Sequence, residues 1–203
     1  MTTHDFTALL MSICMALGTA CGASAPPPAQ TPAKPAGAAD VSRYLPLKHD
    51  SVFAYDTMSE ATGESGVLIV QVTRPRPDMA ELKVGGRAQR LDIGTDGIRH
   101  ATGGYLLKAP LTVGSRYKGQ FGEVSVTSVE RTMHVPAGNF VGCVETVEEA
   151  RTPVAKKVTT TFCPDVGMVL LVAEGMLEGA YAAERATLRS FGPRVDLSAL
   201  PPE

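Results

Sequence analysis

Two cysteines, Cys143 and Cys163, are the residues whose types and spacing most clearly suggest chemistry. They lie in runs rich in Val, Thr, Glu and Lys on either side of Pro153. Folding the chain back at Pro153 places the two cysteines opposite each other, and opposed residues of an antiparallel ladder are close enough for a disulfide. A redox pair would normally have C-x-x-C spacing, and a metal site would need further ligands. We therefore predict a structural disulfide, with two separate buried thiols as the alternative.

The same register gives sensible neighbours on both faces of the predicted hairpin. It pairs Glu149 with Lys157, which carry opposite charges, and it pairs Val144 with Phe162, which are both apolar. Both kinds of cross-strand pair stabilise an antiparallel ladder. The predicted disulfide therefore agrees with the hydrophobic and charge pattern of the strands that would carry it.

The other residues that could do chemistry show no catalytic or metal-binding pattern. The histidines beyond the N-terminal segment are scattered and lack a second ligand at a zinc spacing: His49, His100 and His134. Because His134 alternates with Met133 and Val135, we expect it to face water. Three glutamates are predicted to form a solvated strand face: Glu145, Glu148 and Glu149. No G-x-S-x-G, P-loop or G-x-G-x-x-G occurs, so we predict no catalytic residue, metal, cofactor or enzyme activity.

The N-terminal segment predicts export. An apolar run from Phe6 to Leu17 is too short to cross a bilayer and is typical of a signal peptide, which we place at residues 1–20. The following LGTAC resembles a bacterial lipoprotein box, which implies that Cys21 is lipidated and becomes the first residue of the mature protein. The alternative is a buried helix with two incidental cysteines, Cys14 and Cys21.

A tether follows the predicted lipidation site. Residues 21–41 are rich in Ala and Pro and contain almost nothing to bury, so they cannot repay their own ordering entropy. A lipid anchor, a tether and then a single domain at residues 42–203 are typical of a cell-envelope protein held on a membrane. The lipoprotein resemblance favours the outer over the inner membrane, because Gly22 stands where an acidic residue is associated with inner-membrane retention.

The domain is predicted to be all-β. Strand-like runs such as GVLIVQVTR, which starts at Gly66, alternate with turn signals such as Gly85-Gly86 and Asp96-Gly97. The apolar parity shifts by one residue near Thr127 and Ser128, which predicts a β-bulge. No sustained helical period follows the signal region, apart from an ambiguity in the Ala-rich AYAAERA stretch, which starts at Ala180. We expect an antiparallel meander that forms a strongly curved sheet, an open barrel or a sandwich.

Four short motifs carry a resemblance to a broad group of uncharacterised bacterial lipoproteins. They are YLPLKHDSVFAYDT, LLKAPLTVGSRYKG, HVPAGNFVGCVET and FCPDVGMV, which match that group's aromatic-x-Pro-Leu, Pro-Leu-x-x-Gly, PAG-x-F…Cys and Pro-x-x-Gly elements in order. This chain has Phe53 and Tyr117 where Trp is usual, and it adds Cys163 in the last motif. The resemblance spans Tyr44 to about Val172 and implies a β-rich envelope protein with no transferable catalytic residue.

Composition and patterning leave two non-enzymatic functions. A net charge of -2 gives no basic face for nucleic acid. Apolar residues on both parities of VLIVQV and MVLLV fit either a cavity for a hydrophobic small molecule or lipid, or packing against a second sheet. The low aromatic content, 5% with no Trp, favours a tethered interaction or structural module whose partner is another envelope protein. The sequence does not indicate which residues would bind a ligand.

Overall fold

The computed structural model of the chain describes residues 38–151, 155–177 and 180–194. A short helix, α1 (Ala38–Tyr44), precedes the strands, and together they are called the β domain below. The strands are β1 (Ser51–Ser59), β2 (Ser65–Arg76), β3 (Met79–Val84), β4 (Arg87–Ile93), β5 (Gly97–His100), β6 (Tyr105–Lys108), β7 (Arg116–Lys118), β8 (Glu123–Val135), β9 (Gly138–Ala150), β10 (Lys156–Cys163), β11 (Gly167–Leu177) and β12 (Ala180–Pro193).

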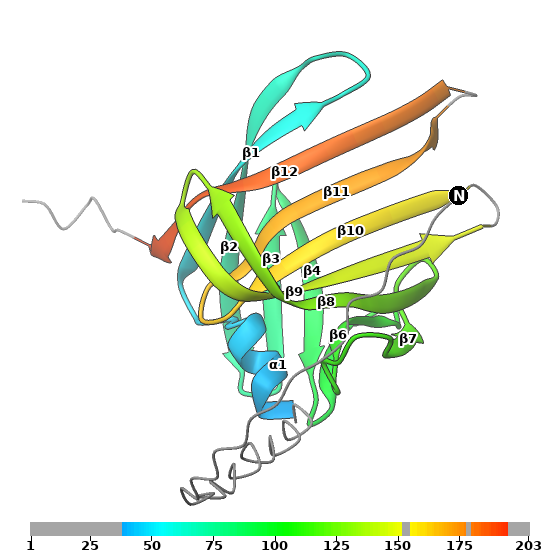
Figure 1. Cartoon of the computed structure of the whole chain (residues 1–203). Helices are drawn as coiled ribbons and strands as arrows, with labels where there is room; N and C mark the ends of the chain where they lie inside the picture. Colours follow the sequence, from blue (N-terminus) through cyan, green and yellow to red (C-terminus); the bar gives the residue numbers. More distant parts are fainter. Residues whose placement is uncertain (1–37, 152–154, 178–179, 195–203) are drawn as a thin grey trace, which may run out of the picture. The chain divides into compact units, whose positions relative to one another are not determined.

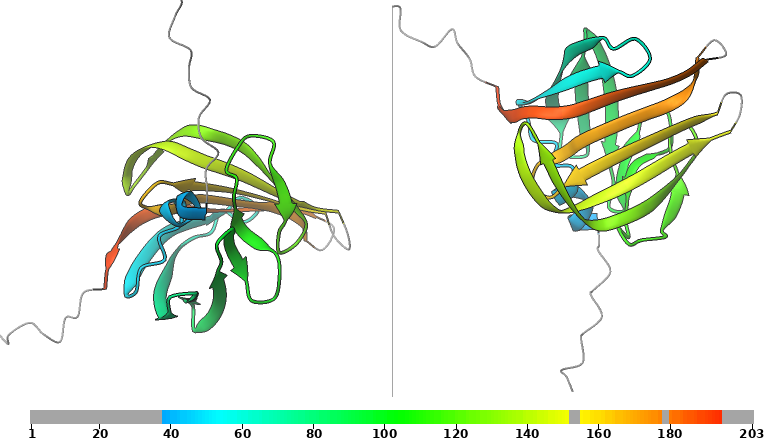
Figure 2. Two further views of the ribbon diagram at one scale, coloured as in Figure 1. Left: turned by 90° about the horizontal axis from the view of Figure 1, so that it is seen from below. Right: turned by 45° about the horizontal axis from the view of Figure 1, so that its top comes forward.

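All strands belong to one antiparallel sheet (Figure 1). Its order is β6-β5-β4-β3-β2-β1-β12-β11-β10-β9-β8-β7, so every strand pairs with its neighbours in the chain except at the two edges. The first and last strands, β1 and β12, pair at the centre of the order. The sheet curls into a nearly closed barrel whose free edges are β6 and β7 (Figure 2). The predicted all-β antiparallel meander is therefore confirmed, in its open-barrel form.

Local turn chemistry sets the hairpins as the sequence predicts. Val84 pairs with Arg87 across a two-residue loop, and the loop residues Gly85 and Gly86 have φ values of 52° and 80°. Both positions need a left-handed backbone in a type I′ turn, which glycine adopts without a side-chain penalty. The turn at Asp96-Gly97 also forms, between β4 and β5.

The predicted irregularity in the longest hairpin is confirmed. The β8–β9 register shifts between Val126 and Ser128 and shifts twice more before Met133. Bulges bend a strand and increase its twist. The bent hairpin curls over, and at its tip the backbone N–H of Ala137 donates to the carbonyl of Leu188 in β12 at 3.1 Å (Figure 2).

The sequence pattern does not predict α1, whose first residues fall in the range assigned to the tether. Val41 is only 1% exposed, so the packed domain begins before residue 42. The helix is one to two turns long, and the only buried i, i+4 pair is Val41 with Leu45, the residue just after its end, which is too short a pattern to detect as a period. The Arg43 guanidinium donates to the Asp165 carboxylate at 3.1 Å, and Tyr44 Oη donates to the Gly142 carbonyl at 3.0 Å.

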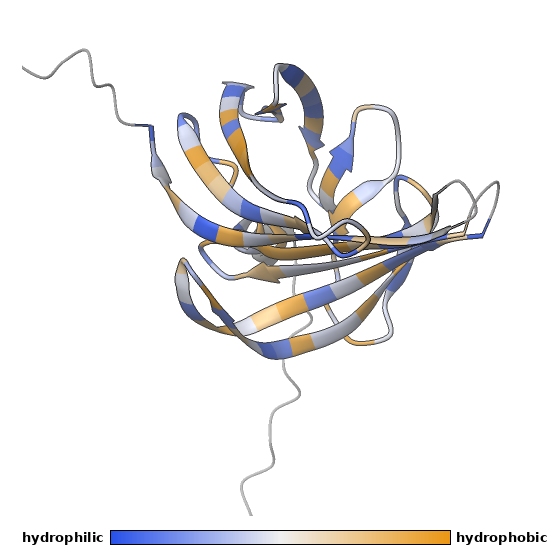
Figure 3. Cartoon of the chain, turned by 90° about the horizontal axis from the view of Figure 1, so that it is seen from above, coloured by the Kyte–Doolittle hydropathy of each residue, from blue (hydrophilic) through white to orange (hydrophobic). Residues whose placement is uncertain are grey.

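Inward-facing and outward-facing side chains alternate along the strands, as the period of two of a β-strand requires. On β2, Val70 and Val72 face inward, while Val67 and Ile69 face solvent with 56% and 50% of their surface exposed. Figure 3 shows the same alternation of hydrophobic and hydrophilic residues along other strands. On β2, the apolar residues of one parity therefore face the barrel interior, and those of the other parity lie on the exposed outer face.

Candidate functional site

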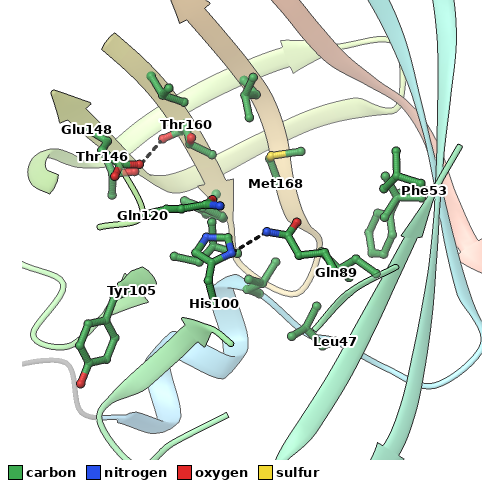
Figure 4. A pocket seen from close by; sticks show the side chains of 18 of the residues that line it. Leu47, Phe53, Gln89, His100, Tyr105, Gln120, Thr146, Glu148, Thr160 and Met168 are labelled. Carbon is green, nitrogen blue, oxygen red and sulfur yellow. Dashed lines mark hydrogen bonds between the residues drawn. The ribbon is translucent and has the colours of Figure 1, made fainter. Parts of the chain in front are cut away.

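The interior of the sheet contains a cavity of about 270 Å³. Its walls come from strands on both sides of the β1–β12 pair and from the segment after α1 (Figure 4). Most lining residues are apolar: Leu45, Leu47, Phe53, Leu68, Val70, Val72, Leu82, Val84, Leu106, Phe121, Val124, Val158, Phe162, Met168 and Leu171. The remaining ones carry polar atoms: Tyr55, Gln89, His100, Tyr105, Gln120, Thr146, Glu148 and Thr160. An apolar chamber with a few polar groups is the usual composition of a small-molecule site.

His100 is a buried ionisable group of this wall, with 8% of its surface exposed. It ends β5 on the same parity as Ile98, which directs both side chains inward. Gln89 Nε2 lies 2.7 Å from His100 Nδ1. With the amide nitrogen as donor, Nδ1 is the acceptor and the ring proton is on Nε2. Burial lowers the pKa of His100, and the Glu148 carboxylate opposes that shift, so the neutral imidazole is favoured.

The sequence prediction for Glu148 is wrong. It was predicted on a solvated face with Glu145 and Glu149, but it lines the cavity and its Oε1 accepts hydrogen bonds from the backbone N–H groups of Phe121 and Gly122. The bond from Gly122 is 2.9 Å long. The parity of the strand explains the error, because residue 148 is in phase with the inward-facing Val144 and out of phase with residues 145 and 149.

The two neighbouring glutamates behave differently from Glu148 and from each other. Glu149 is exposed, as predicted, and pairs with Lys157 in the register. The prediction of a solvated position is also wrong for Glu145, because its side chain is only 14% exposed and forms an ion pair with Arg131 on β8. Only one of the three glutamates therefore reaches the cavity.

Gln120 completes a group of polar side chains at one part of the wall. Figure 4 shows Gln120 and Gln89 on either side of His100. Within the described part of the chain, the Gln120 amide and Glu148 Oε2 have no hydrogen-bond partner. We call Gln89, His100, Gln120 and Glu148 the polar cluster. Its free donors and acceptors are available to a molecule that enters the cavity.

The free edges of the sheet meet beside this cluster. The rings of Tyr105 on β6 and Tyr117 on β7 make an edge-to-face contact with centroids 6.1 Å apart. A side chain on Gly104 would collide with the backbone of Gly119, so the two loops approach as closely as glycine permits. The seam is thus closed by side-chain and backbone packing instead of ladder hydrogen bonds.

Tyr105 is held at the seam by charged neighbours. Its hydroxyl donates to Asp96 at 2.5 Å, and this bond raises the pKa of Tyr105 and lowers the pKa of Asp96. The Lys108 ammonium lies 4.6 Å and the Arg99 guanidinium 5.0 Å from the centroid of the Tyr105 ring. The π-face of an aromatic ring attracts cations at such distances. These contacts hold Tyr105 in place in the part of the cavity wall that lies next to the seam.

The predicted disulfide is confirmed. Cys143 on β9 and Cys163 at the end of β10 are bonded, their Cα atoms are 4.2 Å apart, and both side chains are fully buried. The register that predicted the bond is also observed, since Lys157 pairs with Glu149 and Phe162 with Val144. Cys21, the predicted lipidation site, lies outside the described residues.

The histidines remain separate. His49 Nδ1 accepts from the Arg74 backbone N–H at 3.0 Å, and His134 is exposed as predicted, with its Nδ1 2.7 Å from Asn139 Oδ1. Within residues 38–151, 155–177 and 180–194, no three His, Cys, Asp or Glu residues are grouped so that they could hold a metal. In the same part of the chain, no helix is long and apolar enough to span a membrane.

No protein-family model matches this chain, and no curated protein matches it. Among solved structures, a Bacteroides fragilis protein described as a "putative exported protein with YmcC-like fold" is 13% identical, with a TM-score of 0.44 over 73% of this chain and 98% of that one. A "putative lipoprotein" from Parabacteroides distasonis is 11% identical, with a TM-score of 0.39 over the same shares. At these TM-scores, the likenesses assign neither a family nor a function to this chain.

Proposed function

We propose that the protein is an exported, lipid-anchored envelope protein whose β domain binds a small amphipathic molecule without acting on it chemically. The observation that carries this proposal is the apolar cavity inside the curved sheet, with the polar cluster on one part of its wall. Its volume of about 270 Å³ exceeds the roughly 150 Å³ of an engineered cavity that binds benzene and is close to the roughly 300 Å³ at which drug-sized pockets begin. The ligand is therefore small.

Export is supported by two independent features. The leader and the box at Cys21 resemble those of bacterial lipoproteins. The Cys143–Cys163 disulfide fits an oxidising compartment, because thiols stay reduced in the cytosol. Replacing Cys21 by serine should move the protein from the membrane fraction to the soluble fraction of the envelope. Retention of the variant in the membrane fraction would contradict lipid anchoring at this residue.

A matched pair of substitutions on β2 tests ligand binding. Val70→Phe places an aromatic ring in the cavity, whereas Val67→Phe makes the same change on the outer face of the same strand. In a titration with an environment-sensitive naphthylamine dye, the wild type and Val67→Phe should enhance the dye's fluorescence, and Val70→Phe should lose the enhancement. Equal enhancement by both variants would place dye binding outside the cavity and contradict the proposal.

A second function, the protein-interaction module expected from composition, is favoured by the free edge of β2. Residues 65–69 pair with β1, and the β2–β3 pairing begins only at Val70. An extended segment of an envelope protein could add to this edge, with Val67 and Ile69 as apolar contacts on the outer face. Photo-crosslinking in cells from position 67 should then yield a defined partner that position 71, which is paired on both sides, does not. Identical crosslinking from both positions would contradict this second function.

A further inference from the structure

We propose that the polar cluster selects a neutral, hydroxyl-bearing head group and discriminates against carboxylates and phosphates. This inference rests on the proposed function, because it concerns the ligand of the same cavity. It follows from the charges on the wall, from the hydrogen-bonding capacity that the cluster leaves free, and from the absence of any competing cation among the described lining residues.

The charge on the cavity wall disfavours an anionic ligand. Glu148 contributes a carboxylate, whereas no Lys or Arg occurs among the described residues that line the cavity. Three cations lie over rings of lining residues without lining the cavity themselves. Lys156 is 3.8 Å from the Phe121 centroid, and Lys108 and Arg99 are 4.6 Å and 5.0 Å from the Tyr105 centroid. An anionic head group would therefore lose its hydration to face a like charge without a paired cation, which is unfavourable in a partly dehydrated site.

The polar cluster leaves two hydrogen-bonding atoms available to a ligand. Glu148 Oε1 is occupied by the N–H groups of the β7–β8 turn, which leaves Oε2 as an acceptor. His100 Nδ1 is occupied by Gln89, which leaves the proton on Nε2 as a donor. The cavity thus offers a ligand one strong acceptor and one donor in the same cluster.

A hydroxyl group fits both requirements. It can donate to Glu148 Oε2 and accept from His100 Nε2, and Gln120 can supply either partner through its amide. An ammonium group could donate to the carboxylate but has no lone pair to accept the imidazole proton. A carboxylate could accept from His100 but would face Glu148. The cluster is therefore complementary to an alcohol, and the apolar wall to the hydrocarbon part of the same molecule.

The test compares three probes that share one chain and differ only in the head group: 1-octanol, octanoate and octylammonium. Methionine methyl groups labelled with ¹³C give a site-specific NMR readout on the full chain, because Met168 lines the cavity and Met58 is 43% exposed on the outside. The expected result is a saturable shift of the Met168 signal with octanol, at an affinity at least about tenfold higher than for octanoate. The Met58 signal should not move.

Two neighbouring glutamates provide matched variants. Glu148→Gln removes the charge from the wall but keeps an oxygen that can accept from the turn, whereas Glu149→Gln makes the same change at an exposed site of the same strand. Octanoate should gain affinity in Glu148→Gln and stay weak in Glu149→Gln. Equal gains in both variants would overturn the assignment of selectivity to Glu148.

The outcomes separate this inference from the proposed function. If none of the three probes shifts the Met168 signal, the cavity does not take such ligands and the proposed function fails as well. If all three bind the wild type with equal affinity, the cavity binds amphiphiles but the selectivity for a hydroxyl group is refuted. If octylammonium binds more tightly than octanol, the role of His100 Nε2 as a donor is refuted.

Discussion

Replacing both Cys143 and Cys163 by alanine should lower the free energy of unfolding of the β domain by about 3 kcal/mol. The bond joins two positions 20 residues apart, and the chain-entropy relation for a loop of that length gives this value. Alanine is the appropriate replacement because both side chains are fully buried. Serine would place two hydroxyl groups in an apolar environment and add an unrelated desolvation penalty.

The size of the domain converts this free energy into a melting temperature. For domains of 150–250 residues, about 1 kcal/mol shifts Tm by about 2–4 °C, so the double variant should melt about 6–12 °C below the wild type. Urea unfolding followed by far-UV circular dichroism gives the free energy directly by linear extrapolation. Tryptophan fluorescence is not an option, because the chain contains no Trp.

A reducing agent supplies the control for this experiment. Dithiothreitol should destabilise the wild type towards the variant and leave the double alanine variant unchanged, because only the wild type has a bond to reduce. A loss of less than about 1 kcal/mol in the variant would show that the unfolded chain gains little freedom when the bond is removed, and would refute the entropic reasoning.

Two further changes test the polar cluster and the seam. Burial lowers the pKa of His100 below the roughly 6.5 of an unfolded histidine, so the unfolded chain binds more protons and stability should fall as pH drops below about 6.5. His100→Gln should reduce that loss in urea titrations between about pH 7 and about pH 5, whereas a pH profile parallel to the wild type would contradict it. Gly103 and Gly104 both have positive φ, but only at Gly104 would a Cβ collide with the backbone of Gly119. Gly104→Ala should therefore lose about 1–3 kcal/mol more stability than Gly103→Ala in the same titration, and equal losses would show that the seam does not need this close approach.

The sequence predicted the features that depend on local patterns. The Gly85-Gly86 turn, the bulge near Ser128 and the Cys143–Cys163 register each follow from residues close in the chain or from one hairpin. Period-two alternation determines which face a strand residue occupies, and turn residues determine where the strand reverses. These rules operate within a hairpin and need no knowledge of the rest of the fold.

The cavity could not be predicted in the same way. It depends on the pairing of β1 with β12, which joins Phe53 to Phe191 across most of the chain, and no local signal specifies that contact. The parity of Glu148 with Val144 could have indicated that this carboxylate faces inward, but three glutamates in five residues favoured a solvated face. The in-phase positions of Ile98 and His100 were a similar signal for the buried histidine. The parity could not reveal that the two polar side chains, Glu148 and His100, line the same cavity.

Native mass spectrometry of residues 22–203, produced without the predicted signal peptide and lipidation site and purified from an oxidising periplasm, tests the central claim, ligand binding in the cavity, most directly. We predict a small amphipathic molecule bound to the wild type and to the Val67→Phe variant, and no bound molecule on the Val70→Phe variant. Fragmentation of the released adduct should show an alcohol and no carboxylate or phosphate. A bare wild-type chain, or an adduct that persists in Val70→Phe, would contradict the claim that this cavity binds a ligand.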